Sequence, residues 1–166
     1  MSRAAHALVR LAAEEYFGVP CPETVRLPGG KPDFAPGSGL HFSLSHSYGA
    51  VLAGVSEREI GVDLELERAV NDRFACRLFS EKMLRAFGYY GGWTLRESAY
   101  KLGAPGHLMS MELEPEAGGA LVSAPGGAVC RRYDGLTGYA CAAAAWDRSA
   151  LPDRLVIVAP ERLFKD

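Results

Sequence analysis

Strict alternation of apolar and polar residues predicts one strand with two unlike faces. In residues 60–67, IGVDLELE, every second side chain is apolar. Successive strand residues point to opposite faces, so the other face carries Asp63, Glu65 and Glu67. Like charges this close on one face repel each other. A cation bound between Asp63 and Glu65 would explain their alignment, and so would a solvated strand face without a partner. We expect Glu67, at the strand end, to be exposed.

The same kind of pattern predicts a mixture of helices and strands without a regular βαβ order. Helices are expected over 3–17, over 80–88 with Ser80 as N-cap, and over 93–102. Strands are expected at 24–27, 40–46, 50–56, around AAAAW (142–146) and at 155–158, and the Gly- and Pro-rich segment 28–39 is expected to be a loop. This order favours an α+β fold with a mainly antiparallel sheet.

Composition limits the classes of function. The chain has 166 residues, 48% of them hydrophobic, which is enough for a globular core. A formal net charge of −2 predicts no bulk attraction to nucleic acid or to an anionic membrane. The N-terminal segment is too charged for a signal peptide, since Glu14 and Glu15 interrupt it, and no apolar run is long enough to span a bilayer. The four cysteines lack a C-x-x-C spacing, which predicts free thiols in a cytoplasmic protein.

Two segments supply candidate metal ligands. Asp63 and Glu65 have Cβ atoms about 7 Å apart in a strand, a separation that one Mg²⁺ can bridge. On a helix, Glu97 and Lys101 lie one turn apart on the same face. Glu97 would add a third oxygen ligand, and Lys101 would neutralise phosphate charge. An ordinary surface ion pair, or a capping box formed by Thr94 and Glu97, explains this second segment equally well.

A third segment offers donors for an anion. Alternation in HFSLSHS (41–47) places Ser45, His46 and Ser47 near a strand end, where they could donate hydrogen bonds to phosphate oxygens. A Ser45–His46 nucleophile pair is disfavoured because adjacent strand residues point in opposite directions. A polar strand terminus is the structural alternative. Lys31, in the GGKP turn, is free to reach a ligand or is simply solvated.

The order of these segments resembles that of 4′-phosphopantetheinyl transferases. The matching motifs are G-K-P at 30–32, F-S-x-S-H-S at 42–47, G-V-D-L-E at 61–65 and W-x-x-R-E-S-x-x-K at 93–101. The first two are typical of the larger, pseudo-dimeric type that primes peptide and polyketide synthases. The resemblance extends from about Ala4 to Trp146. It implies the transferase-like α+β fold, here as one compact unit with a shortened N-terminal half, 1–57, and a C-terminal half, 58–166, that holds the metal site.

The resemblance also implies an activity and a set of roles. The family uses Mg²⁺ to move the 4′-phosphopantetheine arm of coenzyme A onto a serine of an apo acyl or peptidyl carrier protein. Carried over by position, the metal ligands would be Asp63, Glu65 and Glu97. Glu97, Lys101 and His46 would be the catalytic residues, with Lys101 on the diphosphate. The coenzyme would be bound by Lys31, Ser45, His46, Arg96 and Lys101.

Two departures from the family pattern affect these expectations. The family motif F-[ST]-x-x-E supplies a carboxylate thought to deprotonate the carrier serine, and here Met83 occupies its place. Glu81 lies about 200° round the helix from Met83 and cannot substitute. The N-terminal half also lacks an opening strand and some basic residues, for which Arg3, Arg10 and Arg26 are candidate replacements. A bare sheet edge would then be accepted as it is or covered by self-association.

Two other functions fit parts of the pattern. A degenerate module could bind coenzyme A or a carrier protein without turnover, as Met83 would suggest. A metal-dependent phosphodiesterase would also use clustered acids and a lysine. Such nucleases often carry a lysine two residues after a strand acid, which Glu65-Leu66-Glu67 lacks, and the acidic charge balance does not favour nucleic acid.

Overall fold

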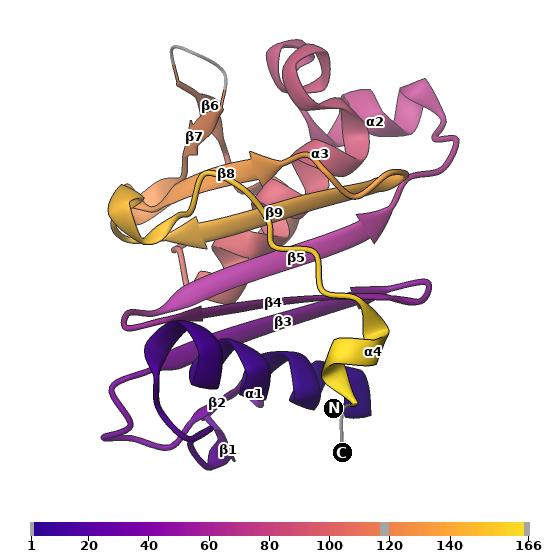
Figure 1. Cartoon of the computed structure of the whole chain (residues 1–166). Helices are drawn as coiled ribbons and strands as arrows, with labels where there is room; N and C mark the ends of the chain where they lie inside the picture. The colour runs from indigo at the N-terminus through magenta and orange to yellow at the C-terminus, as the bar shows by residue number, and fades with distance from the viewer. Residues whose placement is uncertain (1, 117–119, 165–166) are drawn as a thin grey trace.

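Helices and strands follow one another in the chain without a repeating unit (Figure 1). The computed structural model describes residues 2–116 and 120–164. The helices are α1 (Arg3–Phe17), α2 (Asp72–Leu78), α3 (Glu81–Leu102) and α4 (Pro160–Leu163). The strands are β1 (Thr24–Arg26), β2 (Pro32–Phe34), β3 (His41–Ser47), β4 (Ala50–Ser56), β5 (Ile60–Leu66), β6 (Glu114–Pro115), β7 (Leu121–Ser123), β8 (Val129–Tyr133) and β9 (Tyr139–Ala145).

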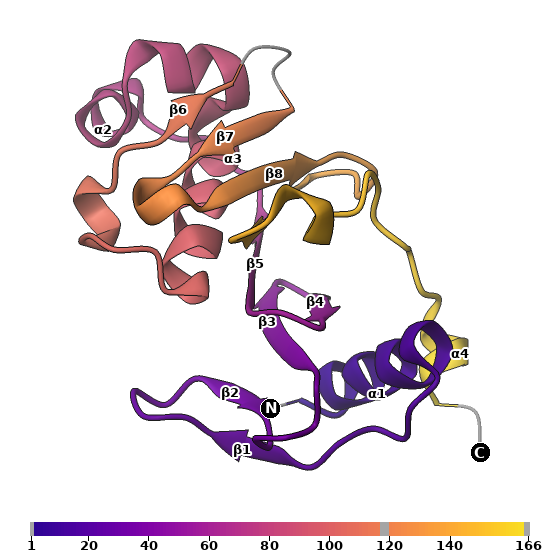
Figure 2. The ribbon, with the colours of Figure 1, turned by 90° about the vertical axis from the view of Figure 1, so that its left-hand side faces the viewer.

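The strands form one sheet and two hairpins. The sheet has five antiparallel strands in the order β5-β9-β8-β7-β6, and the hairpins are β1-β2 and β3-β4. Helix α3 packs against β5, β9 and β8 on one face of the sheet. Figure 2 shows α1 beneath the β3-β4 hairpin, on the far side of β5 from α3. The expected α+β class with mainly antiparallel strands is confirmed.

Three apolar clusters fill the spaces between these layers. One lies between α3 and the sheet and includes Leu95, Met111 and Val122. A second lies on the opposite face of the sheet, where the alternating residues Ile60, Val62 and Leu64 are buried. The third joins α1 to the hairpins. The apolar face of β5 therefore faces one cluster, and its acidic face is turned toward α3. None of the helices within the described ranges has the length and apolarity needed to cross a bilayer.

Several predicted elements are confirmed. Helix α1 covers 3–17, with the Ser2 side chain as N-cap and Gly18 in the left-handed conformation (φ 67°) as C-cap. The hairpin strands β3 and β4 lie within one residue of their predicted bounds, and AAAAW falls largely in the buried strand β9. The predicted helices 80–88 and 93–102 are both present within α3, which is interrupted at Gly88 (φ 66°, ψ −176°).

Other predictions are wrong. The segment predicted as a loop contains β2, and the short apolar run 155–158 forms no strand. Helix α2 was not predicted at all. The proposed capping box is also wrong, because Thr94 lies inside α3 and its hydroxyl donates to the Gly91 carbonyl instead of capping a helix start.

Candidate functional site

The candidate site forms where α3 crosses the acidic face of β5. Gly61 allows this crossing to be unusually close. A Cβ atom at Gly61 would lie 2.0 Å from the Ser98 carbonyl oxygen and 2.5 Å from the Leu102 amide nitrogen, both of which belong to the helix backbone. Only glycine therefore permits this packing. The close approach brings Glu97 and Lys101, on the same part of α3, over the strand acids.

Asp63 is the centre of a three-element cluster. Its side chain is buried, and its Oδ1 accepts hydrogen bonds from Ser45 Oγ (2.8 Å) and from Lys101 Nζ (2.7 Å). The three residues come from β3, β5 and α3, which are far apart in the sequence. Asp63 Oδ2 is also buried, but no described residue gives it a hydrogen bond. Buried carboxylate oxygens are usually satisfied, so Oδ2 is a position suited to a ligand.

Serine side chains join β3 to the outer edge of β5. Ser43 Oγ accepts from the Val62 amide (3.1 Å), and Ser47 Oγ accepts from the Leu66 amide (3.1 Å). Ser47 also donates to Glu65 Oε2 at 3.0 Å. These contacts advance in the same direction on both strands, so β3 and β5 run parallel. The edge of β5 is therefore covered by hydroxyl groups from β3.

The charges of the two strand acids act on Glu97 of α3. Its pKa is raised above 4.5, first by burial and then by the charge of Asp63, while Lys101 lowers it and Glu65 raises it further. Both strand acids therefore lie close enough to disfavour ionisation of Glu97. Glu67 is exposed, as expected. A hydrogen bond joins Lys101 to Asp63, and the charges of Asp63 and Glu65 act on Glu97; that the three acids form a metal site stays a prediction.

The chemistry of this cluster fits a divalent cation better than its present geometry does. Within residues 2–116 and 120–164, no three His, Cys, Asp or Glu side chains are arranged as a group able to hold a metal ion. Lys101 and Ser45 donate hydrogen bonds to Asp63 Oδ1, and Ser47 donates one to an oxygen of Glu65. Three carboxylates that repel one another, one with an unpartnered buried oxygen, are nevertheless the donor set that Mg²⁺ prefers.

A pocket of about 550 Å³ lies between α1, the β1-β2 hairpin and β3, and it adjoins the Asp63 cluster only at Ser45. Its lining includes Ser45 and His46, together with Arg26, one of the candidate basic replacements. His46 is exposed, whereas Ser45 is buried with its hydroxyl on Asp63. Lys31 lies next to Pro32 of this lining, and its Nζ donates to the Ile60 carbonyl (3.3 Å). Burial lowers the pKa of Lys31, an effect that Asp33 and Glu59 oppose.

The structure does not bring Arg96 into this cluster. Arg96 is buried, and its terminal nitrogens donate to the carbonyls of Met109 (3.0 Å) and Leu78 (2.8 Å). Its guanidinium also lies 4.2 Å from the centre of the Phe79 ring. Arg96 therefore joins α3 to neighbouring segments. These contacts leave few of its hydrogen-bond donors available to a coenzyme. Met83 is likewise a buried core residue.

Sequence reasoning missed three contributors to the site. Gly61 was noted only as a member of the G-V-D-L-E motif, and Ser43 only as part of the segment HFSLSHS. Ser47 was placed in a phosphate cradle, but its hydroxyl holds Glu65 and the edge of β5. The recurrence of serine at 43, 45 and 47 beside a parallel strand is the signal that could have predicted these contacts.

Comparisons with known proteins add no further support. Neither a scan against protein-family models nor a search of curated proteins gives a match for this chain. The functional argument therefore depends on the motifs and on the arrangement of the side chains described above.

Proposed function

We propose that this chain transfers the 4′-phosphopantetheine arm of coenzyme A to a serine of an apo carrier protein, with Mg²⁺ as cofactor. The main support is the Asp63 cluster. Ser45, Asp63 and Lys101 lie in three separate sequence motifs, and hydrogen bonds join them in one place. The unpartnered Asp63 oxygen supports a cation there.

In this proposal Asp63, Glu65 and Glu97 hold the metal, which supplies Lewis-acid stabilisation of the diphosphate. The Lys101 ammonium, now on Asp63, would donate to a phosphate oxygen beside it. Its side chain is 29% exposed, so its charge is only partly screened. Ser45, His46 and Lys31 surround or adjoin the pocket and would bind the remaining phosphates and the nucleotide.

The proposed reaction forms a bond between the carrier serine oxygen and the β-phosphorus, and it breaks the bond from that phosphorus to the leaving nucleotide phosphate. The leaving oxygen keeps the electron pair, so negative charge increases on the nucleotide side. Lys101 is placed to stabilise that charge. The serine proton must pass to an acceptor other than residue 83, since the buried thioether side chain of Met83 has no basic group.

The deciding experiment mixes the protein with an apo carrier protein, coenzyme A and Mg²⁺, and measures the mass of the carrier. We expect the mass to increase by that of the phosphopantetheine arm. Coenzyme A binding without a mass change would indicate a binding module instead. Cleavage of phosphodiesters without any carrier modification would indicate a phosphodiesterase. Omitting Mg²⁺, and separately supplying Mn²⁺, tests the metal requirement.

A further inference from the structure

A second cavity lies on the opposite side of β5 from the Asp63 cluster. It measures about 640 Å³, within the usual range for small-molecule pockets. Its walls are α1, β4, the apolar face of β5, part of β9 and the segment 152–163, which we call the C-terminal strap. Figure 2 shows the strap descending from the sheet to α4, beside α1. Residues 152–159 of the strap form no helix or strand.

The lining of this cavity is mainly apolar. Leu8 and Ala12 of α1, Leu52 of β4, Val62 of β5 and Ile157 of the strap represent it. Val156 and Ile157 are 55% and 59% exposed, so the strap covers the cavity without burying its own apolar side chains. An extended hydrocarbon chain would remove both surfaces from water.

The polar groups lie where the strap begins. Arg154 is the one charged residue among the described residues that line the cavity, and it has no ion pair within the described ranges. The neighbouring Asp153 is already paired with Arg131. A single unpaired cation beside an apolar cavity is complementary to an amphiphile with one negative charge.

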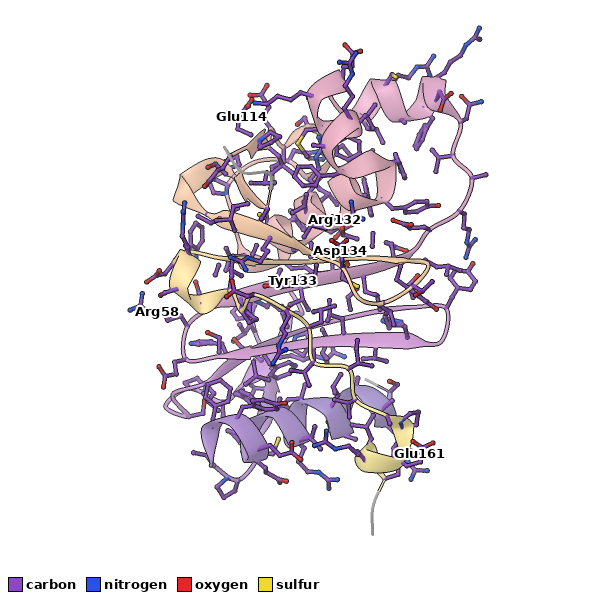
Figure 3. All side chains as sticks on the ribbon, turned by 45° about the horizontal axis from the view of Figure 1, so that its top comes forward. Arg58, Glu114, Arg132, Tyr133, Asp134 and Glu161 are labelled. Carbon is purple, nitrogen blue, oxygen red and sulfur yellow. The ribbon has the colours of Figure 1, made fainter. Side chains whose placement is uncertain are left out.

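Tyr133 provides a second, independent indication. It is only 4% exposed and lines the same cavity, and its hydroxyl has no hydrogen-bond partner among the described residues. Figure 3 shows it beside Arg132 and Asp134 at the end of β8. Burial raises the pKa of Tyr133 to about 12, with Arg131 and Asp153 as the charges that act on it. The phenol therefore remains a donor at neutral pH, close to the start of the strap.

We propose that this cavity binds a free fatty acid, with its alkyl chain between α1, β4 and the C-terminal strap. The carboxylate would lie on Arg154 and accept a hydrogen bond from Tyr133. This site is separate from the Asp63 cluster, and the proposal does not depend on the transferase activity.

Titration calorimetry with dodecanoate, below its micelle-forming concentration, tests the proposal. We expect binding of one molecule per chain. Octanoate should bind more than about tenfold more weakly, because each methylene contributes about fourfold to affinity. The methyl ester of dodecanoate, which lacks the charge, should bind about three- to tenfold more weakly than the acid.

Variants separate the chain site from the head-group site. Ala12→Phe fills the cavity and should abolish binding of the acid and of the ester, whereas Ala86→Phe, at an exposed position of α3, should not. Arg154→Gln, at an exposed position, should lower the affinity for the acid to that for the ester. Circular dichroism verifies that each variant is folded.

Three results would overturn the proposal. The first is no binding of dodecanoate to the parent protein. The second is unchanged affinity in folded Ala12→Phe, which would place the ligand elsewhere. The third is equal affinity for acid and ester in the parent protein, which would exclude the carboxylate site on Arg154.

Discussion

Strand β5 has a different kind of neighbour on each edge. On one edge β9 pairs with it through a continuous antiparallel register from Ile60–Ala145 to Leu66–Tyr139. On the other edge β3 is joined to it by Ser43, Ser45 and Ser47. Backbone hydrogen bonds can be made by almost any sequence, but the second edge exists only because serine recurs at alternate positions.

The difference separates the stability of β5 from its chemistry. The edge shared with β9 holds the strand in the sheet, where substitutions act mainly through packing. The edge shared with β3 connects hydroxyl groups to Asp63 and Glu65. Substitutions there should therefore alter the orientation of these two carboxylates more than the stability of the fold. The predictions below test that division.

The largest effect is expected for Asp63→Asn. The amide keeps the shape of the side chain but removes the charge that Lys101 and a cation would share. Carrier modification should fall about a thousandfold, equivalent to about 4 kcal/mol. The initial rate of mass transfer measures this. Glu67→Gln, at the exposed end of the same face, is the matched control and should retain normal activity. Normal transfer by Asp63→Asn would refute the metal assignment.

The next largest effect is expected for Gly61→Ala. The added methyl group would collide with the backbone of α3 at Ser98 and Leu102, and backbone cannot move aside as a side chain can. We expect the free energy of unfolding to fall by about 3 kcal/mol in urea titrations. Gly54→Ala, whose Cβ would meet the Val62 side chain at 2.7 Å, should cost less. Equal losses would mean that α3 is not held by close contact at Gly61.

How far the sequence alone could predict this structure depends on the range of the interactions involved. Alternation and capping act locally, and they predicted α1, β3, β4, β5 and the break in α3. Residues 155–158 are four consecutive apolar residues, but within the described residues they pair with no strand. Arg96 looked like a coenzyme contact because its motif position is next to Glu97. The carbonyls of Met109 and Leu78, which occupy its guanidinium, lie in other segments and are not visible from the motif.

A moderate effect is expected for Ser47→Ala. This change removes the acceptor for the Leu66 amide and the donor to Glu65, and should lower the free energy of unfolding by about 1 kcal/mol. Because Glu65 would lose its orientation, the Mg²⁺ concentration giving half-maximal transfer should increase about tenfold. Ser123→Ala, at an exposed position of β7, removes a similar hydroxyl–carboxylate contact, to Glu116, and should leave the Mg²⁺ dependence unchanged. An equal Mg²⁺ shift in both variants would argue against a specific role for Ser47.

The smallest effect concerns the cost of ionising Glu97. Since its pKa is raised in the folded state, folding retains a proton that the unfolded chain has released, and stability falls as pH rises from 4.5 through the raised value. Glu97→Gln removes this cost, so without Mg²⁺ the variant should be more stable than the parent at neutral pH, by less than about 1 kcal/mol because the site is partly exposed. Below pH 4.5 the parent and the variant should be equally stable.

Added Mg²⁺ should make the parent more stable than Glu97→Gln, since a cation stabilises the carboxylate of the parent only. Glu67→Gln should show neither change. A Glu97→Gln variant that is less stable than the parent at neutral pH without Mg²⁺ would mean that Glu97 is held by favourable contacts, and the three acids would then need no cation.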